Sequence, residues 1–125
     1  MNFPEILGDL KNTEEFPPQT VIFTEGDPAD VLYVVLSGEV TLTLHGSVLG
    51  TEEEGGIIGE MAVLDAATRN STATTTGPVR LARLDREQLR SLISGNSEFS
   101  MHVLAVLANR LRAVDQYISN RFDRG

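Results

Sequence analysis

The chain has 125 residues, of which 41% are apolar and 22% are charged, a size and balance that fit one globular domain. Its formal charge is −8, which opposes any binding mode that neutralises many phosphates, such as general nucleic-acid binding. The chain has no cysteine, so disulfides, thiolate metal sites, iron–sulfur clusters and cysteine nucleophiles are excluded.

The first ten residues carry no positively charged region and no long apolar run, and no later segment approaches the roughly 20 apolar residues of a membrane span. We therefore expect a cytoplasmic protein without membrane contact.

The charge is unevenly placed, since residues 1–79 hold 13 acidic and two basic residues, whereas residues 80–125 hold eight arginines and five acids. Between Asn12 and Val79, Arg69 is the single cation among eleven acids.

Residues 2–10 predict a short helix, because apolar residues recur in them at helical spacing: Phe3, Ile6, Leu7 and Leu10. We assign residues 1–16 to this helical lead-in. From residue 17 to 85, short runs rich in Val, Ile, Thr and Leu are broken about every eight to twelve residues by turn signals. This pattern of short apolar runs separated by turns is typical of antiparallel β sandwiches and barrels. The expected strands are Thr20–Phe23, Val31–Leu36, Glu39–His45, a piece around Val48–Thr51, Thr72–Thr75 and Val79–Leu84.

After the strands the apolar period becomes helical, over residues 86–122. Asp85 and Gln88 form a capping-box pattern for a helix that stops at Gly95, and a second helix is expected from Ser97 to about Arg121. Apolar residues of the second helix are spaced 3, 4, 3, 4, as in the seam of a coiled coil: Leu104, Leu107, Leu111, Val114 and Ile118. The seam fits packing on the chain's own barrel or a two-fold homodimer, and the homodimer is favoured.

The segment 57–72 carries the most informative motif, in which Gly59 precedes Glu60 and Arg69 follows nine residues later. A turn of helix over residues 60–64 would point free N–H groups at an anion, and Arg69 would add a fork of donors suited to a phosphate. Glu60 would repel a phosphate alone, but a carboxylate accepts a hydrogen bond from a sugar hydroxyl. The segment therefore predicts a nucleotide site, and the alternative is an ordinary turn in which Glu60 and Arg69 pair with each other.

Residues 59–64 followed by Arg69 resemble the phosphate-binding cassette of cyclic nucleotide-binding domains, which occur in catabolite-activator-type regulators, protein kinase A regulatory subunits and cyclic nucleotide-gated channels. Residues 22–27 and 32–40 resemble the opening strands and glycine turns of that family. The resemblance covers nearly the whole chain and implies an antiparallel β jelly roll with flanking helices. It also implies that Arg69 holds the cyclic phosphate and Glu60 the ribose 2′-hydroxyl. The implied ligand-binding set is Gly59, Glu60, Met61, Ala62, Arg69, Asn70 and Ser71.

The cassette departs from the family pattern on both sides of Arg69. The family often has proline before the arginine and small residues after it, where this chain has Thr68, Asn70 and Ser71. Asn70 matches neither the threonine of cGMP-preferring members nor the alanine of cAMP-preferring kinase subunits, and cAMP is favoured here over cGMP. A residue of the last helix commonly closes over the base, and the candidates are Asn109, Arg110, Arg112 and Tyr117.

We therefore expect one domain over residues 1–125 that binds a cyclic nucleotide, forms a homodimer and passes its output to a separate, unidentified effector. No enzyme activity, cofactor, metal or direct nucleic-acid contact is expected. A small hydrolase acting through Glu60 is the least favoured class, because no base, nucleophile or metal accompanies that residue. The main alternative is a ligand-free scaffold for dimerisation or partner docking, in which a Glu60–Arg69 ion pair fills the pocket.

Two groups of polar residues outside the motif are expected to have structural or surface roles. His45 and His102 have no partner at metal-ligand spacing. The C-terminal arginines are interpreted as a solvated helix face: Arg110, Arg112, Arg121 and Arg124.

Overall fold

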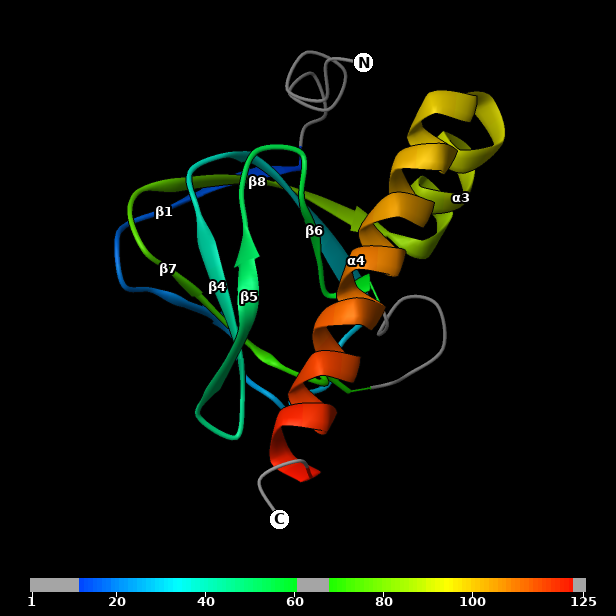
Figure 1. Cartoon of the computed structure of the whole chain (residues 1–125). Helices are drawn as coiled ribbons and strands as arrows, with labels where there is room; N and C mark the ends of the chain where they lie inside the picture. The colour runs from blue at the N-terminus through cyan, green and yellow to red at the C-terminus, as the bar shows by residue number, and fades with distance from the viewer. Residues whose placement is uncertain (1–11, 61–67, 123–125) are drawn as a thin grey trace.

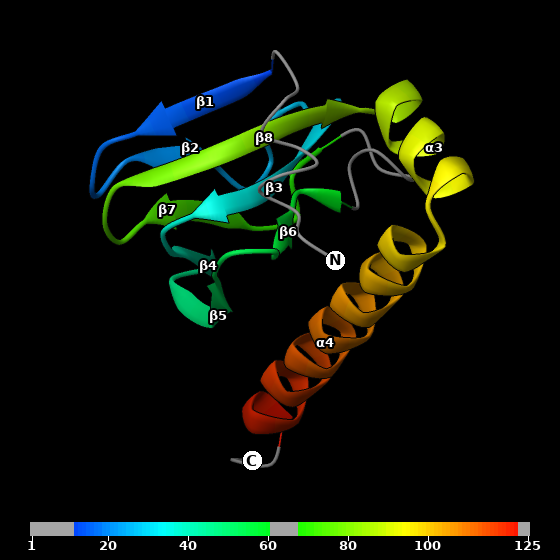
Figure 2. The same ribbon diagram turned by 90° about the horizontal axis from the view of Figure 1, so that it is seen from above.

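The computed structural model of the chain describes residues 12–60 and 68–122. Within them, eight strands form two four-stranded antiparallel sheets with the orders β1-β8-β3-β6 and β2-β7-β4-β5. The strands are β1 (Thr13–Phe16), β2 (Val21–Phe23), β3 (Val31–Ser37), β4 (Val40–Leu44), β5 (Ser47–Glu52), β6 (Ile57–Ile58), β7 (Thr72–Thr75) and β8 (Val79–Asp85). The helices α3 (Arg86–Gly95) and α4 (Ser97–Phe122) follow them and lie to one side of the strands (Figures 1 and 2).

The side chains of β3 alternate between two apolar cores, as the pleat of a strand requires. Tyr33 and Val35 point between the two sheets, whereas Leu32 and Val34 point towards the helices. The buried residues between the sheets are Phe23, Val35, Val40, Leu42, Ile58, Ala73, Val79 and Leu81. Because both faces of β3 are covered, its sequence is a nearly continuous apolar run rather than an alternation.

The second core lies between one sheet and the two helices. The sheet contributes Leu32, Val34, Leu36, Ile57, Ala82 and Leu84, and the helices contribute Leu89, Phe99, Val103 and Val106. At the start of α3, the Asp85 carboxylate accepts a hydrogen bond from the Gln88 amide at 2.8 Å, and the Gln88 side chain accepts one from the Asp85 amide at 2.9 Å. The predicted capping box is confirmed, and it fixes where the chain turns from sheet to helix.

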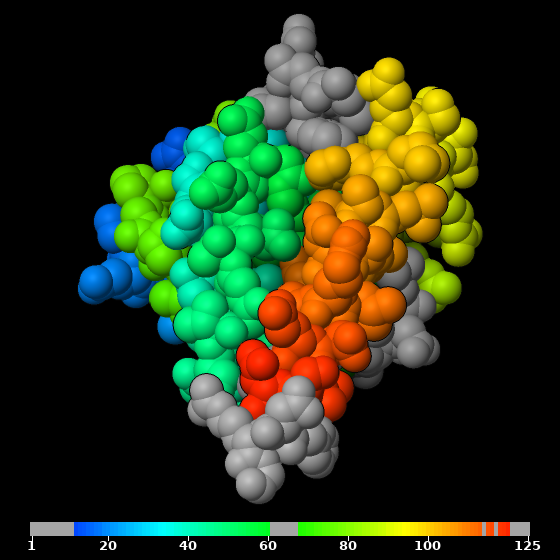
Figure 3. Space-filling model, in the orientation of Figure 1, coloured from blue at the N-terminus to red at the C-terminus, as the bar shows by residue number. Residues whose placement is uncertain are grey.

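Helix α4 carries two apolar faces. Phe99, Val103 and Val106 are buried against the sheet. The predicted seam lies on another face, where Leu104, Leu111 and Ile118 are 59%, 70% and 46% exposed. Leu107 packs partly against the core, and the side chain of Val114 lies outside the described part of the chain. The C-terminal part of α4 lies against β5, as the space-filling view shows (Figure 3).

The predicted mainly β, antiparallel fold with C-terminal helices is confirmed, and it is built from two sheets. The helical lead-in predicted over residues 1–16 is wrong at its end, because β1 occupies Thr13–Phe16. That segment is strand because it pairs along its whole length with β8, from Thr13 opposite Ala82 to Phe16 opposite Val79. Residues 1–11 lie outside the described residues. Among those described, no helix is both long and apolar enough to cross a membrane.

Candidate functional site

Gly59 directly follows β6 and has a φ of 77°, a conformation that L side chains rarely adopt. A Cβ atom at this position would lie 2.5 Å from Arg69 Nη1. The glycine therefore serves two purposes, since it permits the turn out of β6 and leaves room for the arginine. The next residue, Glu60, is only 3% exposed.

Arg69 reaches the same place from the segment that leads into β7. Its amide donates to Asp27 O at 2.8 Å and its carbonyl accepts from the Gly26 amide at 2.8 Å, so the turn after β2 fixes the arginine backbone. Arg69 Nη1 donates to Val31 O at 2.7 Å. The guanidinium also lies over the Phe23 ring, 4.3 Å from its centroid, a favourable cation–π arrangement.

The Arg69 guanidinium is buried, with the residue 7% exposed, and its Nε has no hydrogen-bond acceptor among the described residues. Burial lowers the pKa of Arg69, although a guanidinium stays protonated at neutral pH. Within residues 12–60 and 68–122, no carboxylate forms an ion pair with it. A buried cation of this kind is costly unless an anion completes it.

Glu60 forms an ion pair with Arg110 of α4 and not with Arg69. Its Oε1 lies 3.0 Å from Arg110 Nη1, outside hydrogen-bond geometry, and its Oε2 accepts from the same nitrogen at 3.4 Å. Burial raises the pKa of Glu60, and the charge of Arg110 opposes that shift. The Glu60–Arg69 pair expected of a ligand-free scaffold is therefore not formed in the described part of the chain.

Arg110 was interpreted from the sequence as part of a solvated helix face, and that interpretation is wrong. Its side chain is only 14% exposed, because it crosses from α4 to the end of β5 and to β6. There it meets Glu52 Oε1 at 2.9 Å and Ile57 O at 2.7 Å as well as Glu60. The helical spacing of the sequence could have predicted this burial, since position 110 continues the buried stripe of Phe99, Val103 and Val106.

A cavity of about 220 Å³ adjoins the Glu60–Arg110 pair, between the β4–β5 hairpin and α4. Its lining residues are Leu42, Leu49, Gly50, Thr51, Glu52, Asn109, Arg110 and Ala113. Leucine and alanine side chains offer apolar walls, Gly50 leaves space, and Asn109 supplies an amide. Of the four candidates for a base-closing residue, Asn109 and Arg110 line this cavity. Arg112 is exposed and does not line it, and the Tyr117 side chain lies outside the described residues.

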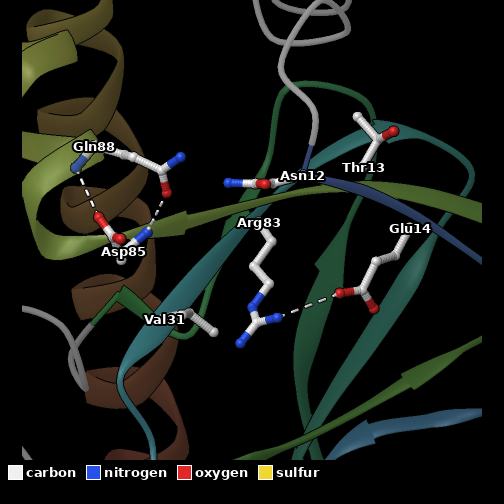
Figure 4. A pocket seen from close by; sticks show the side chains of 7 residues that line it. All are labelled: Asn12, Thr13, Glu14, Val31, Arg83, Asp85 and Gln88. Carbon is white, nitrogen blue, oxygen red and sulfur yellow. Dashed lines mark hydrogen bonds and ion pairs between the residues drawn. The ribbon is translucent and has the colours of Figure 1, made fainter.

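Two further cavities lie away from this site. One of about 310 Å³ opens between β1, β3, β8 and the start of α3, where Arg83 and Glu14 approach to 3.8 Å (Figure 4). The other, of about 510 Å³, lies beside Phe16 and Pro78. Neither includes Gly59, Glu60 or Arg69 in its lining.

The two histidines are found in different surroundings. His45 is 72% exposed at a hairpin turn, with its Nδ1 3.4 Å from Glu25. His102, on α4, hydrogen-bonds the carbonyl of Gly55. Within the described residues, no group of three or more histidine or carboxylate side chains could hold a metal ion.

The structure brings together part of the predicted ligand-binding set. Gly59, Glu60 and Arg69 converge, Ser71 is buried at 4% exposure, and Asn70 is exposed. Met61 and Ala62, with the expected turn of helix over residues 60–64, lie largely outside the described residues. Sequence reasoning missed Glu52 and Phe23, which contact the two arginines and stand outside the motif.

The chain is similar to several known proteins. A family model described as "Cyclic nucleotide-binding domain" matches residues 13–96. The CRP-like cAMP-activated global transcriptional regulator of Mycobacterium tuberculosis is 34% identical over 114 residues, covering 85% of this chain and 50% of that protein. The cAMP-dependent protein kinase regulatory subunit of Yarrowia lipolytica is 32% identical over 89 residues, covering 70% and 24% respectively.

A solved structure, the catabolite activator protein of Thermus thermophilus, matches with a TM-score of 0.69 at 32% identity. The match covers 86% of this chain and 53% of that one. The chain spans about half or less of the length of the two curated relatives.

Proposed function

Since the chain belongs to the cyclic nucleotide-binding domain family, as its motifs predicted, we propose that it is a regulatory sensor domain that binds a cyclic purine mononucleotide. The observation that carries the proposal is the buried Arg69 guanidinium, which has a donor without an acceptor and no paired carboxylate among the described residues. A cyclic phosphate carries one negative charge and acceptor oxygens, so it would complete this site.

Arg69 binds the phosphate and Glu60 binds the ribose. The Arg69 guanidinium is already oriented by Val31 O and the Phe23 ring, so little side-chain freedom is lost when the phosphate arrives. Glu60 Oε1 is buried and accepts no hydrogen bond from the residues that the structure describes, which leaves it ready to accept one from the 2′-hydroxyl. The amides of residues 61 and 62, with those of Asn70 and Ser71, complete the phosphate cradle.

The purine occupies the cavity of about 220 Å³ between the β4–β5 hairpin and α4. Leu42, Leu49 and Ala113 form apolar walls for a flat ring, and Asn109 presents an amide to the base edge. We favour cAMP over cGMP, because the M. tuberculosis and Y. lipolytica relatives are named as cAMP-responsive proteins.

The output passes through α4. Nucleotide binding at Glu60 acts on Arg110, which joins the site to the helix, and so shifts the population of α4 positions. The seam of α4 forms a two-fold homodimer through Leu104, Leu107, Leu111, Val114 and Ile118, of which Leu104, Leu111 and Ile118 are exposed in the single chain. The domain itself catalyses no reaction and contacts no nucleic acid, and a separate effector reads its state.

Titration calorimetry with cAMP and with cGMP tests the proposal. Wild-type protein should bind at least one of them, and Arg69→Ala should weaken binding about tenfold or more, as for a charge-assisted hydrogen bond of about 1.5–3 kcal/mol. Arg83→Ala removes the same charge from a half-exposed position and should bind like wild type. Absence of heat from both nucleotides would refute the proposal.

A further inference from the structure

Arg110 is held by two carboxylates that belong to different parts of the barrel. Its Nη1 lies 3.0 Å from Glu60 Oε1 and its Nη2 lies 2.9 Å from Glu52 Oε1. Nη2 also donates to Ile57 O at 2.7 Å. One guanidinium therefore joins α4 to the end of β5, to β6 and to the residue that follows Gly59.

The two carboxylates differ in depth. The Glu60 side chain is 4% exposed, whereas the Glu52 side chain is 22% exposed and stands at the rim of the cavity. Because a guanidinium is planar and rigid, fixing Nη2 at Glu52 also fixes the direction of Nη1. The orientation of Nη1 towards Glu60 thus depends on a contact outside the nucleotide motif.

We infer that Glu52 is a positioning residue of the nucleotide site, which holds Arg110 so that Arg110 stays on Glu60 and α4 stays seated over the base cavity. The inference rests on the proposed function and extends it to Glu52, which lies at the rim of the base cavity and acts through Arg110. When the ribose hydroxyl takes a Glu60 oxygen, Glu52 keeps its hold on Nη2. The helix then remains closed over the bound purine and slows its release.

The acidic run Glu52–Glu54 offers matched controls, because its members lie in one short segment. Glu53 and Glu54 are exposed, in contrast to the half-buried Glu52. Replacing any of the three by alanine removes one negative charge, and each replacement therefore weakens the repulsion of an anionic nucleotide in the same direction. A general charge effect predicts that Glu52→Ala and Glu54→Ala bind equally well or better, whereas positioning predicts a loss for Glu52→Ala alone.

The first experiment needs no nucleotide. Hydrogen–deuterium exchange of the α4 amides over residues 105–113 should be about tenfold faster in Glu52→Ala than in wild type and unchanged in Glu54→Ala, because a lost charge-assisted contact eases local opening. Glu52→Gln retains an oxygen that accepts from Arg110, so it should recover part of the protection. Equal exchange in the Glu52→Ala and Glu54→Ala proteins would overturn the inference, whether or not a nucleotide binds.

The second experiment follows release of a fluorescent cAMP analogue by stopped flow. Dissociation from Glu52→Ala should be about tenfold faster than from wild type, with Glu54→Ala unchanged. In the double variant Glu52→Ala/Arg110→Met, the two losses should not add, because Arg110→Met by itself already removes the Arg110–Glu52 contact. Additive losses would overturn the inference. Failure of wild type to bind any cyclic nucleotide would refute the proposed function and the ligand-holding role together, while the exchange experiment would still report on the contact with α4.

Discussion

Gly59 adopts a φ of 77°, and a Cβ atom there would lie 2.5 Å from Arg69 Nη1. Gly46, in the hairpin between β4 and β5, has a similar φ of 81°, but a Cβ atom there would meet nothing within 4 Å. The two glycines therefore share the backbone requirement and differ in what surrounds them. This difference separates the conformational role of a glycine from its role in making room for the arginine.

Replacement of each glycine by alanine should therefore give different results. Gly59→Ala and Gly46→Ala should each cost about 1–2 kcal/mol of unfolding free energy from the left-handed backbone, measured by urea denaturation. Only Gly59→Ala should also displace the guanidinium and weaken cAMP binding, by about tenfold in calorimetry. Equal affinity of the two variants would show that Gly59 does not make room for Arg69.

The buried carboxyl of Glu60 should make stability depend on pH. Burial raises the pKa of Glu60, so the folded chain holds this proton more tightly than the unfolded chain does. The contribution of Glu60 to the free energy of unfolding is therefore greatest below its ordinary pKa and decreases as the pH rises through the raised value. Glu60→Gln cannot ionise, so the decrease should be missing from that variant.

Urea denaturation of wild type and Glu60→Gln between about pH 4 and pH 7.5 measures this effect. The stability of wild type relative to the variant should fall as the pH rises, while the other carboxyls cancel in the difference. A difference that stays constant over this range, or grows with pH, would contradict the raised pKa.

Helix α4 shows which features of the fold sequence patterns can predict and which they cannot. The 3,4 spacing identified an apolar seam, which is largely exposed in the structure. The helix also has another apolar stripe of similar period, which is buried against the sheet. Periodicity alone does not say which of the two stripes faces the sheet. The strands β4, β7 and β8 were predicted within one or two residues, because apolar residues and turns mark their limits. β1 was missed because its strand state comes from pairing with β8, a partner far away in the chain.

The two faces of α4 lead to opposite results for the same substitution. Leu111 is 70% exposed in the single chain, so Leu111→Glu should leave the chain folded and dissociate the proposed homodimer, as measured by circular dichroism and sedimentation. Val106 is 7% exposed in the core, so Val106→Glu should unfold the chain by burying an unpaired charge. A wild-type monomer, or a Leu111→Glu protein that sediments as a dimer, would contradict the role of the seam.

At the scale of the whole molecule, the site is assembled from segments that are distant in sequence. The convergence of Gly59, Glu60 and Arg69 was predictable, because one short motif carries all three residues. Glu52 and Arg110 were not assigned to the site, since their contact depends on how α4 rotates and docks on the barrel. Phe23 was missed for a similar reason, because its ring meets Arg69 only when β2 and the segment before β7 come together.

The net charge of −8 should oppose the approach of an anionic nucleotide to the proposed site, although Arg69 would attract its phosphate at short range. Salt screens the distant charges, since the Debye length falls from about 30 Å at 0.01 M to about 8 Å at 0.15 M, but it hardly screens a buried arginine.

The association rate of a fluorescent cAMP analogue, measured by stopped flow, should therefore rise about twofold or more over this range of salt. The dissociation rate is the internal control and should stay constant, because it depends on the buried contacts of Arg69 and Glu60. An association rate that falls with salt would mean that a long-range attractive field guides the ligand. That result would contradict capture by a single buried cation in an acidic barrel.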